Sequence, residues 1–186
     1  MAIPLAMTGD DEETMDLLPL DECVDRYQHR LYRFLLRLVK DPAAAEDLFQ
    51  QTWLQVLRKQ GSFDARRDFE PWLFSVARNL AVDHLRRRQP ESLDEPMEAS
   101  SGSHADAVPS AALDALERLL GGERSALLLR AMDRLPALYR EVLTLRFEEE
   151  MKPEQISVVL GAPVTTVKTR LARGLRQLRA EVGAAR

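Results

Sequence analysis

Residues 68–88 read DFEPWLFSVARNLAVDHLRRR, and this stretch predicts one long helix with an aromatic start and an arginine-rich end. Pro71 suits the first turn of a helix, where a backbone N–H is not needed, and neither Gly nor Pro follows before Arg88. One face of the helix is predicted to be buried, because four apolar residues recur at helical spacing. These residues are Leu73, Val76, Ala77 and Leu80.

The rest of this helix surface carries rings, hydrogen-bond donors and positive charge. Trp72 and Phe74 lie two residues apart, so they cannot share one stripe, and at least one ring is predicted near the surface. One interpretation is an ordinary amphipathic helix with a solvated basic end. The other is a surface for single-stranded nucleic acid, where rings stack on bases and arginines hold phosphates. The face that differs from the buried stripe is formed by Ser75, Asn79, Val82 and Arg86, with Arg78 beside it.

The segment WLFSVARNLAVDHLRRR, residues 72–88, closely resembles the DNA-melting helix of bacterial RNA polymerase sigma factors, in particular of the extracytoplasmic-function (ECF) subgroup. In that family the helix start and the loop before it receive a base that is turned out of the promoter duplex. Residues 60–67 are predicted to form such a loop, because they include the turn residues Gly61, Ser62 and Asp64. The resemblance implies a role in promoter melting for Phe63, Arg66, Arg67, Phe69, Trp72, Arg78, Asn79 and Arg86.

Two further helices are predicted before the loop. Residues 21–40 carry apolar side chains at helical spacing. The dipeptide Asp41-Pro42 ends that helix and starts the next one, with Asp41 as the N-cap. The second helix is predicted to reach about Lys59. Its buried side is predicted to hold Ala45, Leu48, Phe49, Trp53 (or Thr52), Val56 and Leu57.

The opposite face of this second helix is polar. Its sequence PAAAEDLFQQTWLQVLR, residues 42–58, resembles the sigma segment that docks on the clamp helices of the largest polymerase subunit. The resemblance implies that Asp47, Gln50 and Gln51 contact core RNA polymerase. The family usually has an acid where Gln51 stands, so one charge is missing here. A polar helix face that only meets water is the alternative interpretation.

The C-terminal part predicts a helix over 153–160, a tight turn over 161–163 and a second helix over 164–182. This is the layout of a helix-turn-helix, whose second helix enters the major groove. The sequences RLPALYREVLTLRF (134–147) and PEQISVVLGAPVTTVKTRLARGLRQLR (153–179) resemble the C-terminal DNA-binding domain of sigma factors. The face left for the upstream promoter element, or merely for solvent, holds Thr165, Thr166, Lys168, Thr169, Arg170, Arg173 and Arg176.

Three shorter helices are predicted ahead of this motif, at 111–120, 123–135 and 138–147. The family commonly has Ser or Thr as the N-cap of the helix at 153–160. Lys152 stands there and offers no side-chain acceptor, so that helix start is predicted to be less stable by roughly 1 kcal/mol.

Charge is distributed unevenly along the 186 residues. The net charge of −4 seems to disfavour nucleic acid, but residues 1–22 and 89–117 each hold seven acids and no Lys or Arg. The remaining residues hold 16 acids and 26 bases, which is a net charge of +10. Two basic modules, preceded and joined by acidic segments, are therefore compatible with nucleic-acid binding.

The predicted fold is all-α, with two small helical domains joined by a flexible acidic linker. The boundaries are a flexible acidic tail over 1–20, a sigma-like N-terminal domain over 21–88, the linker over 89–110 and a C-terminal helix-turn-helix domain over 111–186. Stretched out, the linker reaches ~73 Å. In the resembling family the two promoter elements lie on the order of 70 Å apart, so such a linker bridges them only when nearly extended. A plain flexible tether is the alternative.

Several classes of function are disfavoured by the sequence. His29, His84 and His104 lie far apart and form no metal-ligand spacing with each other or with the single Cys23, so no metal is expected. Nucleotide-binding glycine loops and a Gly-x-Ser-x-Gly elbow are missing, so neither an enzyme nor a cofactor is expected. A membrane span and a signal peptide are not expected either, which predicts a cytoplasmic protein.

The resemblance covers about residues 22–88 and 125–182. It implies a sigma factor that binds core RNA polymerase, recognises a promoter as duplex, opens its strands and starts transcription. Its implied partners are core RNA polymerase and duplex and single-stranded promoter DNA, with an anti-sigma factor as a candidate and no insertion into a membrane. Two alternatives stay open: a helix-turn-helix regulator that acts without core polymerase, and a sigma mimic that sequesters a partner without binding DNA.

Overall fold

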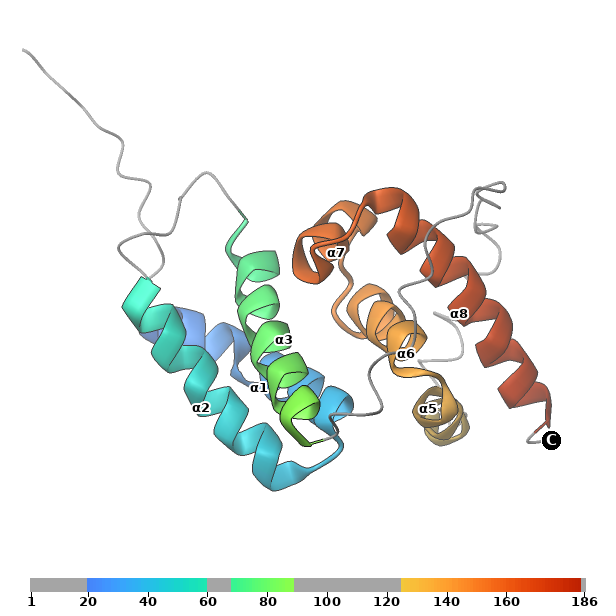
Figure 1. Ribbon diagram of the computed structural model, residues 1–186, viewed down its shortest axis with the longest axis horizontal. Helices are drawn as coiled ribbons and strands as arrows, with labels where there is room; N and C mark the ends of the chain where they lie inside the picture. Colours follow the sequence, from blue (N-terminus) through green and yellow to red (C-terminus); the bar gives the residue numbers. More distant parts are fainter. Residues whose placement is uncertain (1–19, 60–67, 89–124, 185–186) are drawn as a thin grey trace, which may run out of the picture.

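The computed structural model describes residues 20–59, 68–88 and 125–184, and these residues fold into helices, with no strand among them (Figure 1). The all-α prediction is therefore confirmed. The predicted tail, the loop at 60–67, the linker and the helix at 111–120 lie outside the described residues. The helices are α1 (Leu20–Val39), α2 (Pro42–Lys59), α3 (Phe69–Arg88), α5 (Ser125–Arg134), α6 (Ala137–Leu143), α7 (Pro153–Leu160) and α8 (Val164–Ala184), with a π-helical turn, η2 (Thr144–Glu148), after α6.

The N-terminal helices α1, α2 and α3 pack on one another around an apolar core. Phe34 of α1 and Phe74 of α3 are fully buried, and their ring centroids lie 5.1 Å apart. Asp41 caps α2 as predicted, because its Oδ1 accepts the N–H of Ala43 at 3.1 Å. The carboxylate also accepts a hydrogen bond from Arg88 at 2.9 Å, which joins the start of α2 to the end of α3.

The buried sides of α2 and α3 agree with the prediction except at Leu57. Leu57 was predicted to be buried together with Val56, but only Val56 is buried, and Leu57 is 47% exposed because it lies beyond the buried stripe that runs through Leu48, Thr52 and Val56. The Thr52 hydroxyl tolerates full burial because it donates to the carbonyl oxygen of Leu48 at 2.7 Å. On α3, Phe74 lies in the core while Trp72 is only half-buried, so the prediction of one ring near the surface is confirmed.

Helices α7 and α8 form the predicted helix-turn-helix. Gly161 ends α7 with φ of +60°, a conformation that glycine adopts without strain. The Ser157 hydroxyl donates to the carbonyl oxygen of Ala162 at 2.6 Å, which holds the turn. Ile156 and Val159 of α7 are buried, as predicted.

The segment between α5 and α7 departs from the predicted regular helix over 138–147. It is a seven-residue helix, α6, that widens into the π-helical turn η2. After η2, Glu150 has φ of +56°, which is unusual for a residue with a side chain. Buried Arg140 of α6 donates to the carbonyl oxygens of Asp133 and Leu135 at 3.2 and 3.3 Å, and so satisfies the end of α5. Burial lowers the pKa of Arg140.

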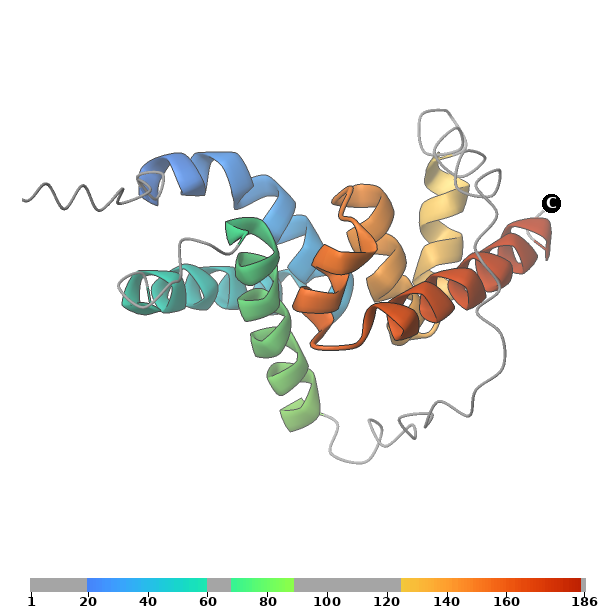
Figure 2. The ribbon, with the colours of Figure 1, turned by 90° about the horizontal axis from the view of Figure 1, so that it is seen from above.

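The N-terminal helices (α1–α3) and the C-terminal helices (α5–α8) pack directly against each other (Figure 2). Helix α3 lies against α7, and α1 contacts α6. Their buried apolar side chains form one cluster that runs through both groups of helices.

Candidate nucleic-acid interface

The exposed side of α2 carries the residues predicted to contact polymerase. Asp47, Gln50 and Gln51 are all exposed. Leu54 and Leu57 follow them toward the end of the helix, at 52% and 47% exposed. Because residues three, four and seven apart share a helix face, these five residues form one strip, which we call the α2 strip. The two leucines were missed from sequence, although their spacing from Gln50 already placed them on this face.

The start of α3 gathers aromatic rings. The Phe69 ring lies 5.8 Å from Tyr27 and 5.7 Å from Trp72, measured between centroids. Phe69 and Trp72 are half-buried, whereas Asn79 and Arg86 are exposed further along the helix. The other predicted melting residues, Phe63, Arg66 and Arg67, lie outside the described residues.

Arg78 of α3 does not face open solvent. Its Nε donates to Oε1 of Glu141 at 2.5 Å, and its Nη2 donates to Oε2 at 3.4 Å. Glu141 belongs to α6 and is buried. A residue predicted to contact promoter DNA is therefore paired with a carboxylate from the C-terminal helices.

The residues predicted to read DNA lie along the first turns of α8. The Thr169 hydroxyl donates back to the carbonyl oxygen of Thr165 at 3.0 Å. Arg170 is half-buried, and burial is the main cause of its lowered pKa, with Glu141 and Arg78 close enough to influence it. Thr166 and Thr169 are also half-buried. The exposed members of the set are Thr165, Lys168, Arg173 and Arg176.

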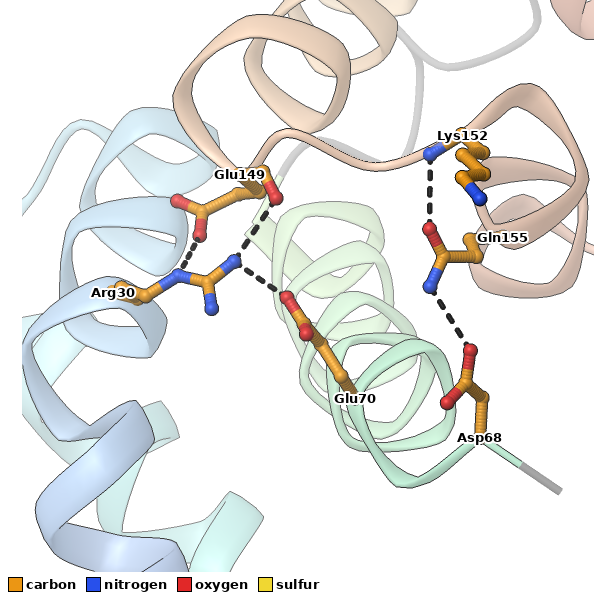
Figure 3. Close-up of polar contacts among 6 residues, drawn as sticks. All are labelled: Arg30, Asp68, Glu70, Glu149, Lys152 and Gln155. Atoms are coloured by element: carbon orange, nitrogen blue, oxygen red, sulfur yellow. Dashed lines mark hydrogen bonds and ion pairs between the residues drawn. The ribbon is translucent and has the colours of Figure 1, made fainter.

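A polar network joins α1 and α3 to the segment before α7 (Figure 3). Arg30 Nε donates to Oε2 of Glu149 at 2.8 Å, and its Nη2 donates to the Glu149 carbonyl oxygen at 3.0 Å and to Oε1 of Glu70. Burial disfavours the charge on Arg30, but the two carboxylates outweigh it and raise its pKa. Glu149 is itself so deeply buried that its pKa is raised despite Arg30.

A second, separate set of hydrogen bonds closes the start of α7 (Figure 3). The Lys152 side chain caps nothing, as predicted, but the Lys152 N–H donates to Oε1 of Gln155 at 2.9 Å. Gln155 Nε2 in turn donates to Oδ2 of Asp68 at 3.0 Å (Figure 3). Gln155 thus satisfies the N–H of the N-cap residue Lys152, and it also reaches the N-terminal helices.

Metal-binding groups and membrane-spanning helices are both missing from the part of the chain that the structure describes. These residues contain no group of three or more His, Cys, Asp or Glu side chains that could hold a metal ion. Among the helices of residues 20–59, 68–88 and 125–184, none combines the length and apolar character needed to cross a membrane.

Comparison with known families and proteins gives a consistent result. Residues 23–91 match the model of sigma-70 region 2, and residues 125–178 match the model of sigma-70 region 4. The ECF RNA polymerase sigma factor SigW of Bacillus subtilis is 31% identical, over 94% of this chain and 91% of SigW. SigM of the same organism is also 31% identical, over 88% of this chain and 94% of SigM.

Solved structures show the same fold. The sigma factor RpoE of Bartonella quintana, in complex with the anti-sigma factor NepR, matches with a TM-score of 0.66 and 23% identity, over 89% of this chain and 98% of RpoE. CnrH in complex with the cytosolic domain of CnrY matches with a TM-score of 0.62 and 23% identity, over 90% of this chain and 89% of CnrH. With two sigma-70 regions in the family order and relatives matched over nearly their full length, the chain belongs to the ECF RNA polymerase sigma factors.

Proposed function

We propose that this sigma factor, which directs transcription initiation, divides its tasks between three surfaces. The observation that carries the proposal is that regions 2 and 4 occur in one chain and each displays an exposed polar helix face. We assign 21–88 and 111–186 as the two working domains and 89–110 as their linker. The role is not catalytic, and it is exercised in the cytoplasm, where core polymerase meets the chromosome.

The α2 strip is the proposed contact with core polymerase. Asp47 supplies charge, Gln50 and Gln51 supply hydrogen bonds, and the exposed Leu54 and Leu57 supply apolar area. This combination resembles an interface in which an apolar patch provides affinity and polar groups fix the orientation.

The surface of α3 is the proposed site of strand opening. Trp72 offers a ring for stacking, Asn79 offers an amide to a base edge, and Arg86 offers charge to the backbone. Unpairing a base costs only a few kcal/mol, so binding energy alone can drive it without ATP. The rest of the proposed site, Phe63, Arg66 and Arg67, precedes α3 in the sequence and lies outside the described residues.

The exposed side of α8 is the proposed reader of the upstream element. Its threonines and arginines suit phosphate oxygens and base edges in the major groove. We also propose an anti-sigma factor as a partner, because two proteins of the same fold were solved as complexes, RpoE with the anti-sigma factor NepR and CnrH with the cytosolic domain of CnrY.

The experiment is transcription by bacterial core RNA polymerase on candidate promoters, with and without the chain, and with permanganate to report unpaired thymines. We expect new start sites and strand opening only with the chain, and weaker opening with Trp72→Ala or Asn79→Ala. Binding to core without opening would favour the sigma mimic. Duplex binding without any binding to core would favour the helix-turn-helix regulator.

A further inference from the structure

The aromatic group at the start of α3 extends onto α1, which lies beside it (Figure 2). The Phe69 ring lies between the rings of Trp72 and Tyr27, with centroids 5.7 and 5.8 Å away. Tyr27 is buried, whereas Phe69 and Trp72 are half-buried. The row of rings therefore begins at the proposed melting surface of α3 and ends inside α1.

Two arginines of α1 lie over the Tyr27 ring. The guanidinium carbon of Arg26 lies 5.6 Å from the ring centroid, and that of Arg30 lies 5.8 Å from it. Both distances are typical of cation–π contacts. Arg30 is also held by Glu70 and Glu149, so its charge is used within the fold.

Arg26 differs from Arg30 in both exposure and partners. It is exposed, and no ion pair among the described residues includes it. A ring attracts a guanidinium without using any of its five N–H donors. Contact with Tyr27 also restricts the side chain, which reduces the entropy lost when a ligand binds it. Arg26 therefore offers a positioned, unneutralised charge at the end of the row of rings.

Rings beside a cation are the combination that single-stranded nucleic acid needs. Bases stack on the rings, and the cation holds a phosphate of the same strand. The first turn of α1 carries the acids Asp21 and Glu22, which favour the start of a helix but repel a phosphate. We therefore place the strand at Arg26 rather than at the start of α1.

We propose that Arg26 binds a phosphate of the opened promoter strand, next to the nucleotide that stacks at Phe69 and Trp72. The proposal rests on the proposed function for the strand itself, and it adds a residue of α1 to a surface assigned to α3 and the residues before it. Paired bases cannot stack on these rings, so the contact forms only after opening. A contact made only with the opened strand shifts the equilibrium toward strand opening.

The first test compares opened and paired DNA, with the full chain bound to core polymerase. The probes are a promoter fragment whose non-template strand is left single-stranded at the start-proximal element, called the fork fragment, and the same fragment fully paired. Arg26→Gln should weaken binding of the fork fragment about tenfold, the effect of one charge-assisted contact. Binding of the paired fragment should stay unchanged.

Two variants serve as controls for the first test. Arg26→Lys keeps the charge and should keep most of the affinity for the fork fragment. Arg130→Gln removes an exposed positive charge from α5, away from the rings, and should leave the affinity for both fragments unchanged. Thermal melts establish that each variant is folded.

The second test locates the phosphate. Each phosphate in the single-stranded part of the fork fragment is replaced in turn by an uncharged methylphosphonate. At one position the native chain should lose about tenfold in affinity, whereas Arg26→Gln should lose nothing further there, because its contact with that phosphate is already missing. A side chain that only supported the packing of Tyr27 would give no such position.

Several outcomes would overturn the assignment of Arg26 while leaving the sigma function intact. These are an equal loss on the fork and paired fragments, a loss with Arg26→Lys or Arg130→Gln as large as with Arg26→Gln, and methylphosphonate effects that are the same in the native chain and in Arg26→Gln at every position. Failure of the native chain to prefer the fork fragment would instead contradict the proposed function, and Arg26 would then have no opened strand to bind.

Discussion

Gly174 of α8 lies directly against Tyr139 of α6, so that a Cβ built on Gly174 would stand 3.2 Å from the Tyr139 Cβ. The same Cβ would stand 3.3 Å from a methyl carbon of Leu143, which is fully buried and cannot move aside. The close crossing of α6 and α8 therefore depends on glycine at position 174, which has no side chain to separate the two helices.

We predict that Gly174→Val lowers the free energy of unfolding by about 2 kcal/mol, because the branched side chain must push α6 away from α8. Gly183→Val is the matched control, since a Cβ there meets nothing within 4 Å. Urea unfolding followed by circular dichroism measures both. A stability loss that is equal in the two variants would contradict the packing explanation.

Glu150 should be a site where glycine is better than the native residue. Its φ of +56° is unfavourable for any residue with a Cβ, and its side chain is exposed. We expect Glu150→Gly to raise the free energy of unfolding by roughly 1 kcal/mol. Glu150→Ala removes the charge but keeps the strained backbone, so it should give no such gain. If alanine stabilises as much as glycine, charge rather than backbone conformation is responsible.

Asp41 should make stability depend on pH in the acid range. The hydrogen bond from Arg88 is the main cause of its lowered pKa, and the N–H groups of Ala44 and Ala43 lower it further. A lowered pKa in the folded chain means that Asp41 stabilises the fold above its ordinary pKa, and that this stabilisation disappears as the pH falls through the lowered value. Asp41→Asn keeps a capping acceptor without the charge.

We therefore expect the native chain to melt at a higher temperature than Asp41→Asn near neutral pH, with the difference vanishing in strong acid. Thermal melts over a pH series provide the measurement. A difference that persists unchanged at low pH would mean that the charge on Asp41 is not its cause.

A substitution in the α2 strip should weaken the binding of core polymerase without changing the stability of the fold. Leu54→Ser should change the free energy of unfolding by less than about 0.5 kcal/mol, because the side chain is already half in water. Affinity for core polymerase should fall several-fold, since apolar area in the centre of an interface contributes strongly to binding. Val158→Ser on α7, which is 58% exposed, is the matched control and should leave core affinity unchanged. A titration of labelled chain with core polymerase gives both affinities.

The parts of the fold that the sequence predicted are those set by local chemistry. Asp41-Pro42 starts α2, and Gly161 ends α7, because capping and positive φ depend on one or two residues. The widening of the helix at 144–148 has no comparable local signal. Leu57 was misplaced because helical spacing alone does not fix the width of the buried stripe, which on α2 ends at Val56.

The exposure of individual side chains was likewise easier to predict than their contacts within the fold. Asp47, Gln50 and Asn79 are exposed where the family resemblance assigned them to partner surfaces. The pairing of Arg78 with Glu141 joins residues 63 positions apart, and helical periodicity carries no information about such a distant partner. Only the packing of α3 against the C-terminal helices brings that pair together.

The carboxylate of Glu141 also changes the thermodynamics of DNA binding in a measurable way. Affinity for DNA normally falls with salt because each arginine that reaches a phosphate releases condensed counterions. When Arg78 leaves Glu141 for a phosphate, the condensed counterions of that phosphate are still released, but the ion pair inside the protein is lost. The plot of log affinity against log salt should therefore keep the slope set by the number of phosphate contacts, while the affinity at each salt concentration is lower than it would be without the Arg78–Glu141 pair.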